Sequence, residues 1–290
     1  MFDFDIINSN TLLGESGFYL HKTNEIVFLD LLNPSIFFYS IESKILIKKK
    51  LSLPKPLGNI YPLVNGKFII SCFNGLYIYD RKKNSLQHYL DVRQKKELKD
   101  ISYNDGTISR NKFWIGLCHI KETDDLGYFG YINNKKFVEI DRGFKVSNGP
   151  AINEKLNKLY FSDSFNSSIY EYNLRTLKRK IIYKFDKKQG FPDGIALDSQ
   201  NGLWVAHWAG GQVSRINLKS SKIDLQIKLP ALNITSVTFV GKKLNHLFIT
   251  SAKLETSKIQ LEKYKHAGSS FIIKTGYKGL KIPYGNTKIL

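Results

Sequence analysis

Residues 192–218 read PDGIALDSQNGLWVAHWAGGQVSRINL, three short hydrophobic segments separated by turn-forming residues. The segments are Pro192–Asp198, Leu203–Trp208 and Gln212–Leu218, and Ile223–Leu229 adds a fourth of the same kind. Apolar and polar residues alternate within the third segment, as expected of a strand with one buried face. The intervening turns are rich in Gly, Asn and Ser, which favour tight reversals of the chain. We therefore predict four consecutive strands here.

The opening of the second segment recurs at a nearly constant interval along the chain. The period is roughly 42–46 residues, which is in the range of four-stranded propeller blades. The six openings are Ile26-Val27-Phe28-Leu29, Phe68-Ile69-Ile70, Phe113-Trp114-Ile115, Leu159-Tyr160-Phe161, Leu203-Trp204-Val205 and Leu247-Phe248-Ile249. The sequence thus predicts an all-β fold, a six-bladed β-propeller with four-stranded blades. Such a fold brings the first strand of every blade to one central channel.

The last repeat lacks a clear fourth strand. It offers Ile234–Val240, Leu247–Ser251 and Ser270–Lys274, whereas the short N-terminal strand Phe2–Ile7 has no partner in the first repeat. We predict that this N-terminal strand completes the sixth blade, because ring closure leaves no long strand edge exposed. No linker or shift in composition divides the chain, so residues 1–290 are expected to form a single propeller domain.

Composition limits the choice of partners and compartment. The chain has 44 Lys and Arg against 25 Asp and Glu, a net charge of +19, but the lysines are scattered through turns and no aromatic-studded basic motif occurs. We therefore expect no nucleic-acid partner. Cys72 and Cys118 lie inside strand patterns and are predicted to be buried, reduced thiols. The absence of a secretory signal and of a long apolar run predicts a cytoplasmic protein with no membrane association. The sequence carries no signal for an oligomeric state.

Polar residues recur at the start of the first strand of each repeat. They are Glu15, Asn59, Asn104-Asp105, Asn148, Asp193 and Thr235-Ser236. One such residue would ordinarily be a turn residue, but equivalent positions in several blades converge on one channel. Two buried carboxylates there require a cation or protons. An all-oxygen set without His suits one divalent metal ion, Ca²⁺, Mg²⁺ or Mn²⁺, with Zn²⁺ as a candidate at a carboxylate-rich catalytic site.

Five stretches in register also resemble the senescence marker protein-30/gluconolactonase/regucalcin family over nearly the whole chain. They are Gly14-Glu15-Ser16; Asn104-Asp105-Gly106 with Phe113-Trp114-Ile115-Gly116; Ser147-Asn148-Gly149-Pro150 with Tyr160-Phe161-Ser162-Asp163-Ser164; Gly190–Asp198 with Gly202–Ala206 and Gly210–Val213; and Thr235-Ser236 with Phe248–Ala252. The resemblance implies a six-bladed propeller that hydrolyses sugar lactones and related cyclic esters, small-molecule substrates.

The same resemblance implies the role of each site residue. Glu15, Asn148 and Asp193 would be the protein ligands of one divalent metal ion, and Asn104 would contact substrate or water beside it. Metal-polarised ester hydrolysis agrees with the carboxylate-rich site deduced from the repeats. Asp193, next to the metal, is the best candidate for the general base.

One position departs from the family pattern. Two residues before the Asn-Asp-Gly motif, where lactonases of this family usually have a substrate-binding arginine, this chain has Ser102. Tyr103, Lys121 and Arg110 are the candidates to take over that contact, and loss of the guanidinium changes the expected substrate. Two other functions therefore stay open: a Ca²⁺- or small-ligand-binding propeller without enzymatic activity, and a metal-dependent phosphotriesterase-like hydrolase.

Four further residues are interpreted as follows. His207 is expected to be a packed or solvent-facing histidine, with a pocket-lining role as the alternative, and Asp105 is expected to organise its own turn. Asp163 and Asp198 are expected to satisfy backbone groups between strands rather than bind metal.

Overall fold

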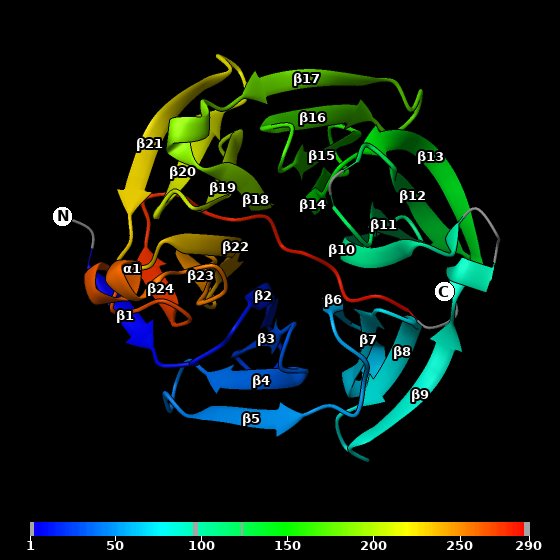
Figure 1. Cartoon of the computed structure of the whole chain (residues 1–290), viewed down its shortest axis with the longest axis horizontal. Helices are drawn as coiled ribbons and strands as arrows, with labels where there is room; N and C mark the ends of the chain where they lie inside the picture. The colour runs from blue at the N-terminus through cyan, green and yellow to red at the C-terminus, as the bar shows by residue number, and fades with distance from the viewer. Residues whose placement is uncertain (1–2, 95–97, 123, 287–290) are drawn as a thin grey trace.

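The computed structural model describes residues 3–94, 98–122 and 124–286, which form six four-stranded antiparallel sheets around a central channel (Figure 1). The predicted six-bladed propeller is confirmed. Five blades run outward from the channel in chain order, and the sixth runs β22, β23, β24 and then β1, so β2, β6, β10, β14, β18 and β22 are the innermost strands. Their neighbours bury both faces, and the hydrophobic cores lie between adjacent blades.

The elements have the following bounds. The strands are β2 (Gly14–Leu20), β3 (Glu25–Asp30), β4 (Ser35–Ser40), β5 (Leu46–Lys50); β6 (Leu57–Pro62), β7 (Lys67–Cys72), β8 (Gly75–Asp80), β9 (Ser85–Leu90); β10 (Ile101–Ser109), β11 (Lys112–His119), β12 (Gly127–Asn133), β13 (Lys136–Phe144); β14 (Ser147–Asn153), β15 (Lys158–Asp163), β16 (Ser168–Asn173), β17 (Arg179–Lys184); β18 (Phe191–Leu197), β19 (Gly202–Trp208), β20 (Gln212–Asn217), β21 (Lys222–Lys228); and β22 (Asn233–Val240), β23 (His246–Ala252), β24 (Ser270–Lys274), β1 (Phe4–Ile7). The 3₁₀ turns are η1 (Val64–Gly66), η2 (Val92–Gln94) and η4 (Lys187–Gln189), and α1 spans Lys258–Lys263.

Closure of the ring occurs where the N-terminal strand was predicted to lie. β1 pairs antiparallel with β24, from Phe4 opposite Ile273 to Ile7 opposite Ser270. The rings of Phe4 and Phe271 meet edge to face, with centroids 5.8 Å apart. The sixth blade therefore joins both ends of the folded ring.

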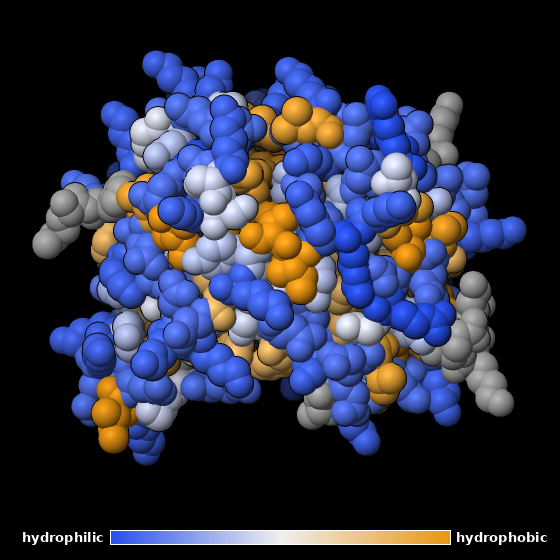
Figure 2. All heavy atoms as spheres, turned by 90° about the horizontal axis from the view of Figure 1, so that it is seen from above, coloured by the Kyte–Doolittle hydropathy of each residue, from blue (hydrophilic) through white to orange (hydrophobic). Residues whose placement is uncertain are grey.

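The long connection between β23 and β24 contains the short helix α1, which begins after a capping Ser257. In the described parts of the chain, no helix is long and apolar enough to cross a membrane. Figure 2 shows one side of the ring, where hydrophilic side chains cover most of the face and hydrophobic ones form small separate groups.

All six innermost strands are irregular at the same level of the channel. In each, the pairing with the second strand of the blade shifts register, between Glu15 and Phe18, Leu57 and Ile60, Tyr103 and Gly106, Asn148 and Ala151, Pro192 and Ile195, and Ile234 and Val237. A β-bulge bends the strand locally and redirects its side chains. Six bulges at one level therefore build a ring of redirected residues inside the channel.

The segment 277–285, here called the C-terminal strap, crosses the opening of the ring after β24 (the red trace in Figure 1). The N–H of Leu280 donates to the carbonyl of Leu197 at 3.3 Å, and the N–H of Gly285 donates to the carbonyl of Pro62 at 2.9 Å. The Tyr61 hydroxyl donates to the carbonyl of Pro283 at 2.8 Å. All of these partners lie toward the ends of innermost strands, so the strap covers the far end of the channel from the strand starts.

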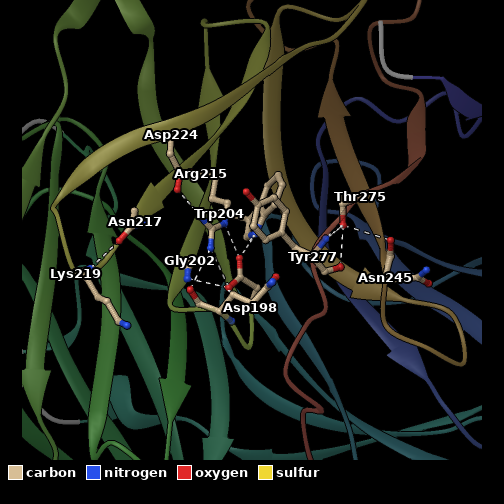
Figure 3. Close-up of polar contacts among 11 residues, drawn as sticks. Asp198, Gly202, Trp204, Arg215, Asn217, Lys219, Asp224, Asn245, Thr275 and Tyr277 are labelled. Carbon is tan, nitrogen blue, oxygen red and sulfur yellow. Dashed lines mark hydrogen bonds and ion pairs between the residues drawn. The ribbon is translucent and has the colours of Figure 1, made fainter.

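A buried ion pair supports the beginning of the strap. Figure 3 shows Asp198, Arg215 and Asp224 pointing toward one another, with Trp204 and Tyr277 beside them. Arg215 Nε donates to Asp198 at 2.7 Å and Nη1 to Asp224 at 2.5 Å, and the guanidinium lies 4.0 Å from the centre of the Tyr277 ring. Burial alone would raise the pKa of Asp198, but hydrogen bonds from Arg215 and from the backbone outweigh it and lower that pKa.

The two aspartates expected to satisfy backbone groups do so. Asp198 accepts hydrogen bonds from the N–H groups of Gln200 and Gly202, each at 2.8 Å. Asp163 accepts from the N–H of Val146 at 3.3 Å and from the Asn166 amide at 2.7 Å. These predictions are confirmed.

Candidate functional site

Glu15, Asn148 and Asp193 come from blades one, four and five, at or beside the bulges of β2, β14 and β18. Their exposed fractions are 6%, 9% and 6%. Ser162 connects two of them, because its hydroxyl lies 2.7 Å from the carbonyl of Asp193 and 3.2 Å from that of Asn148. The negative charge of Asp193 acts on Glu15, so these two carboxyls are also close. The structure thus brings the three predicted residues to one region of the channel.

The amide of Asn148 has a defined orientation. Its Nδ2 donates to Ser164 Oγ at 2.8 Å, which turns Oδ1 to the other side. Asn104 Nδ2 reaches that Oδ1 at 2.5 Å and also donates to the carbonyl of Ser147 at 2.9 Å. Asn148 therefore presents an oxygen toward Asn104, and Asn104 lies beside the predicted ligand set.

The carboxyls of Glu15 and Asp193 are in an unfavourable electrostatic environment. Burial, and then the charges of Asp193 and Asp105, raise the pKa of Glu15 well above its usual range. Burial and the charge of Asp105 do the same to Asp193. Among the described residues, Glu15 Oε1 has no hydrogen-bond partner. A bound cation would give Glu15 Oε1 a partner and would balance the negative charges of the Glu15 and Asp193 carboxylates.

The donor set limits the kind of metal that fits. No group of three or more His, Cys, Asp or Glu side chains in the described ranges is arranged to hold a metal ion. The converging set is instead two carboxylates and one amide oxygen, which are hard oxygen donors. Glu15, Asn148 and Asp193 therefore fit a hard divalent cation completed by water or substrate.

Asp105 was expected to organise its own turn, and this interpretation is wrong. Its side chain accepts hydrogen bonds from two other blades: from Ser16 Oγ at 3.2 Å and from the Gly149 N–H at 2.8 Å. Only 5% of the residue is exposed. The reason is structural: the bulge between Tyr103 and Gly106 directs both Asn104 and Asp105 into the channel.

The other polar residues of the ring support the backbone around the site. Asn59 Nδ2 donates to Ser16 Oγ at 3.3 Å. The Thr235 hydroxyl lies 2.5 Å from the carbonyl of Gly14 and 2.7 Å from the Thr250 hydroxyl. Blades two and six thus brace the strand that carries Glu15.

Two predicted substrate contacts of blade three, Ser102 and Tyr103, lie in different environments in the structure. Ser102 is half-buried and two positions before Asn104, so strand alternation places it on the same face. Tyr103 is 2% exposed, packs in the core, and its hydroxyl accepts from the Val92 N–H at 2.7 Å and donates to Asp91 at 3.3 Å. We therefore do not retain Tyr103 among the substrate contacts.

Arg110 cannot replace the missing arginine. Its guanidinium donates to the carbonyl of Glu154 at 3.1 Å and to the side chain of Asn157 at 2.5 Å, both in the turn after β14. That turn lies at the end of the channel opposite the starts of the strands. Lys121 lies at the end of the channel where the innermost strands start, exposed on the connection after β11.

Of the two environments expected for His207, packed or solvent-facing, the structure shows the packed one. It is fully buried at the end of β19 and meets the Phe185 ring edge to face at 4.8 Å. Burial lowers the pKa of His207 to about 4, so the imidazole is neutral in the folded protein near neutral pH.

Beyond the bulges the channel contains a cavity of about 730 Å³. Its lining starts at Ser16, Asp105, Gly149 and Gly194, one residue past the predicted site residues, and ends at Leu280–Pro283 of the strap. The carboxylates therefore lie at the boundary between the strand starts and this strap-covered cavity.

Comparison with known proteins agrees with the geometry. The chain is 28% identical to regucalcin of Danio rerio over 292 residues, 97% of each protein, and 25% identical to 6-deoxy-6-sulfogluconolactonase of Pseudomonas putida over 96% of each. A solved structure of the calcium-binding protein regucalcin from Agrobacterium tumefaciens has the same fold, with a TM-score of 0.89 at 18% identity over 98% of this chain and 97% of that one. Residues 13–253 match the family described as SMP-30/Gluconolactonase/LRE-like region. This chain belongs to the SMP-30/gluconolactonase/LRE-like family.

Proposed function

We propose that this protein is a metal-dependent hydrolase that opens lactones, either a sugar lactone or a related cyclic ester. The observation that carries the proposal is the convergence of two buried carboxyls with raised pKa values, Glu15 and Asp193, on the Asn148 amide. Perturbed groups collected in a channel are typical of functional sites. The lactonase names among the relatives support the reaction class.

In this proposal the ligands are Glu15, Asn148 and Asp193. A bound divalent cation, Ca²⁺, Zn²⁺, Mg²⁺ or Mn²⁺, would polarise the ester carbonyl, stabilise the charge that develops on its oxygen, and keep Asp193 ionised near neutral pH. Asp193 accepts a proton from the water that attacks the carbonyl carbon. When the new C–O bond forms, the π electrons of the carbonyl move onto its oxygen; when they return, the ring C–O bond breaks, and the proton held by Asp193 passes to the departing alkoxide. The product is one hydroxy acid.

Asn104 and Ser102 would determine how the substrate is held. Asn104 Nδ2 is already aimed at the Asn148 oxygen, so a small shift of the side chain would let it donate to a substrate oxygen instead. Ser102 offers one hydroxyl where a guanidinium would offer a planar set of donors. We therefore propose a substrate that does not depend on a strong anion contact at this position.

A second function is favoured by the same serine. A propeller that keeps the cation site but loses a substrate contact could bind Ca²⁺ or a small ligand without turnover. The regucalcin of Agrobacterium tumefaciens is described as a calcium-binding protein, which is compatible with such a role here.

A lactone panel distinguishes these functions. Purified protein is stripped of metal with a chelator, restored with Ca²⁺, Zn²⁺, Mg²⁺ or Mn²⁺ in turn, and assayed for acid release from neutral and acidic sugar lactones and from simple cyclic esters. We expect turnover only after metal is restored. Tight metal binding without turnover of any lactone would favour the binding protein, and cleavage of aryl phosphotriesters alone would favour a phosphotriesterase-like hydrolase.

A further inference from the structure

Two of the proposed ligands are followed directly by residues in an unusual backbone conformation. Ser16, after Glu15, has φ 58°, and Gly149, after Asn148, has φ 76°. A left-handed conformation is costly for a residue with a side chain and persists only when its surroundings hold it. Both residues lie inside bulges of the innermost strands, so their conformation decides where the preceding side chain points.

One carboxylate holds both of these residues. Asp105 Oδ1 accepts from Ser16 Oγ at 3.2 Å, and Asp105 Oδ2 accepts from the Gly149 N–H at 2.8 Å. Asp105 belongs to blade three, whereas Ser16 and Gly149 belong to blades one and four. A buried side chain thus links three blades at the level of the site.

A carboxylate suits this linkage. The Gly149 N–H can only donate, so the oxygen that faces it must accept, and an ionised carboxylate also accepts from Ser16 on its other oxygen. Asparagine would remove the negative charge and reverse the contact with Ser16, whose proton would then be left to the Gly58 carbonyl at 3.3 Å. The charge of Asp105 acts unfavourably on the carboxyls of Glu15 and Asp193 but would act favourably on a bound cation, since carboxylates just outside the ligands raise the affinity of a metal site.

We propose that Asp105 is a positioning residue that fixes the bulges of β2 and β14, aims Glu15 and Asn148 at a common point, and thereby sets the affinity of the channel for a divalent cation. The inference rests on the metal site of the proposed function but not on its lactonase activity. Asp105 acts through Ser16 and Gly149 and need not touch the cation or the substrate.

The test measures cation binding directly. Titration calorimetry with Ca²⁺ and with Mn²⁺ compares the full-length protein with Asp105→Asn. We expect Kd to rise by roughly 10–100-fold, the usual effect of losing a side chain that orients metal ligands without touching the metal. Ser16→Ala, which removes one of the two hydrogen bonds and keeps the carboxylate, should weaken binding by a smaller factor. It also provides a test if Asp105→Asn fails to fold.

Ser109→Ala is the matched control, because Ser109 is buried on the same strand but bonds to Glu154 at the other end of the channel. Its Kd should equal that of the wild type. If Asp105→Asn and Ser16→Ala lower the melting temperature of the metal-free protein but leave Kd unchanged, Asp105 has only a structural role and the proposal is overturned. A wild type that binds these ions but opens no lactone would overturn the proposed function and leave this inference intact.

Discussion

The two ends of the channel differ although the same six strands build both. At the strand starts, bulges direct Glu15, Asn148 and Asp193 inward, and Glu122 and Glu255 follow on the connecting loops. At the strand ends, the strap covers a cavity whose lining carries both signs of charge, Glu154 and Asp198 as well as Lys155 and Lys281. One end therefore gathers buried carboxylates that a cation can balance, whereas the other mixes both charges and is covered by packed chain. Each innermost strand therefore contributes to the candidate site at its start and to packing against the strap side at its end.

The largest expected effect tests whether the strand starts carry the chemistry. Asp193→Asn keeps the shape of the side chain but removes the proton acceptor, so we expect kcat on the best lactone of the panel to fall by about 10²–10⁴-fold. Steady-state kinetics with saturating metal measures this. Asp100→Asn is the control, because Asp100 is an exposed carboxylate just before β10. Equal activities of Asp193→Asn and wild type would remove Asp193 from the mechanism.

The far end should affect stability and not chemistry. Arg215→Met leaves the buried carboxyl of Asp198 without its guanidinium partner and removes the contact of Arg215 with Tyr277 of the strap. Breaking a buried pair by removing one partner typically costs about 3–5 kcal/mol of unfolding free energy. Urea unfolding measures the loss, and calorimetry should give an unchanged Kd for Ca²⁺ below the unfolding transition. A large change in Kd would mean that the two ends are coupled.

The ends should also differ in their response to acid. His207, near the strand starts, has a pKa of about 4 when folded and about 6.5 when unfolded, so the unfolded chain binds more protons between these values. The stability that it contributes is present above pH 6.5 and is lost as pH falls toward 4. From pH 7 to pH 5 the loss is about 2 kcal/mol. Asp198, with a lowered pKa, loses its contribution only when the pH falls below the ordinary Asp range.

Urea unfolding of wild type and His207→Gln at pH 7 and pH 5 isolates this contribution. Other buried carboxyls titrate in both proteins and cancel in the difference between them. We expect the wild type to lose about 2 kcal/mol more than the variant on acidification. Parallel losses would show that His207 is not the group responsible.

The architecture of the ring was what the sequence predicted best. Hydrophobic alternation and a regular period identified the blades, the closure by β1 and a set of polar residues at the strand starts, and the family resemblance then singled out three of these as proposed ligands. Strand geometry alone could have separated Tyr103 from Ser102, because neighbours on a strand point to opposite faces. It could also have excluded Arg110, since six residues along a strand from Asn104 span roughly 20 Å.

The remaining features depend on contacts between distant parts of the chain. The role of Asp105 arises because a bulge interrupts the alternation between Tyr103 and Gly106, and no pattern in the sequence announces that bulge. The sequence of the strap does not show the alternation of apolar and polar residues that is typical of a strand. Its hydrogen-bond partners also lie far away in sequence, as in the bond from the Tyr61 hydroxyl to the Pro283 carbonyl. Such features follow from the closed ring and not from local preference.

The smallest expected effect concerns which substrate the strand starts accept. Ser102→Arg places a guanidinium two residues before Asn104 on the same face of β10, where it can donate to a substrate carboxylate or sugar oxygens. We expect kcat/KM for an acidic sugar lactone to rise about tenfold, close to 1.4 kcal/mol, with little change for an uncharged cyclic ester. Ser102→Met adds a side chain of similar length without charge and should give no gain. If Ser102→Arg and Ser102→Met behave alike on every lactone, the position does not contact the substrate, and the departure at Ser102 leaves the substrate class of the family unchanged.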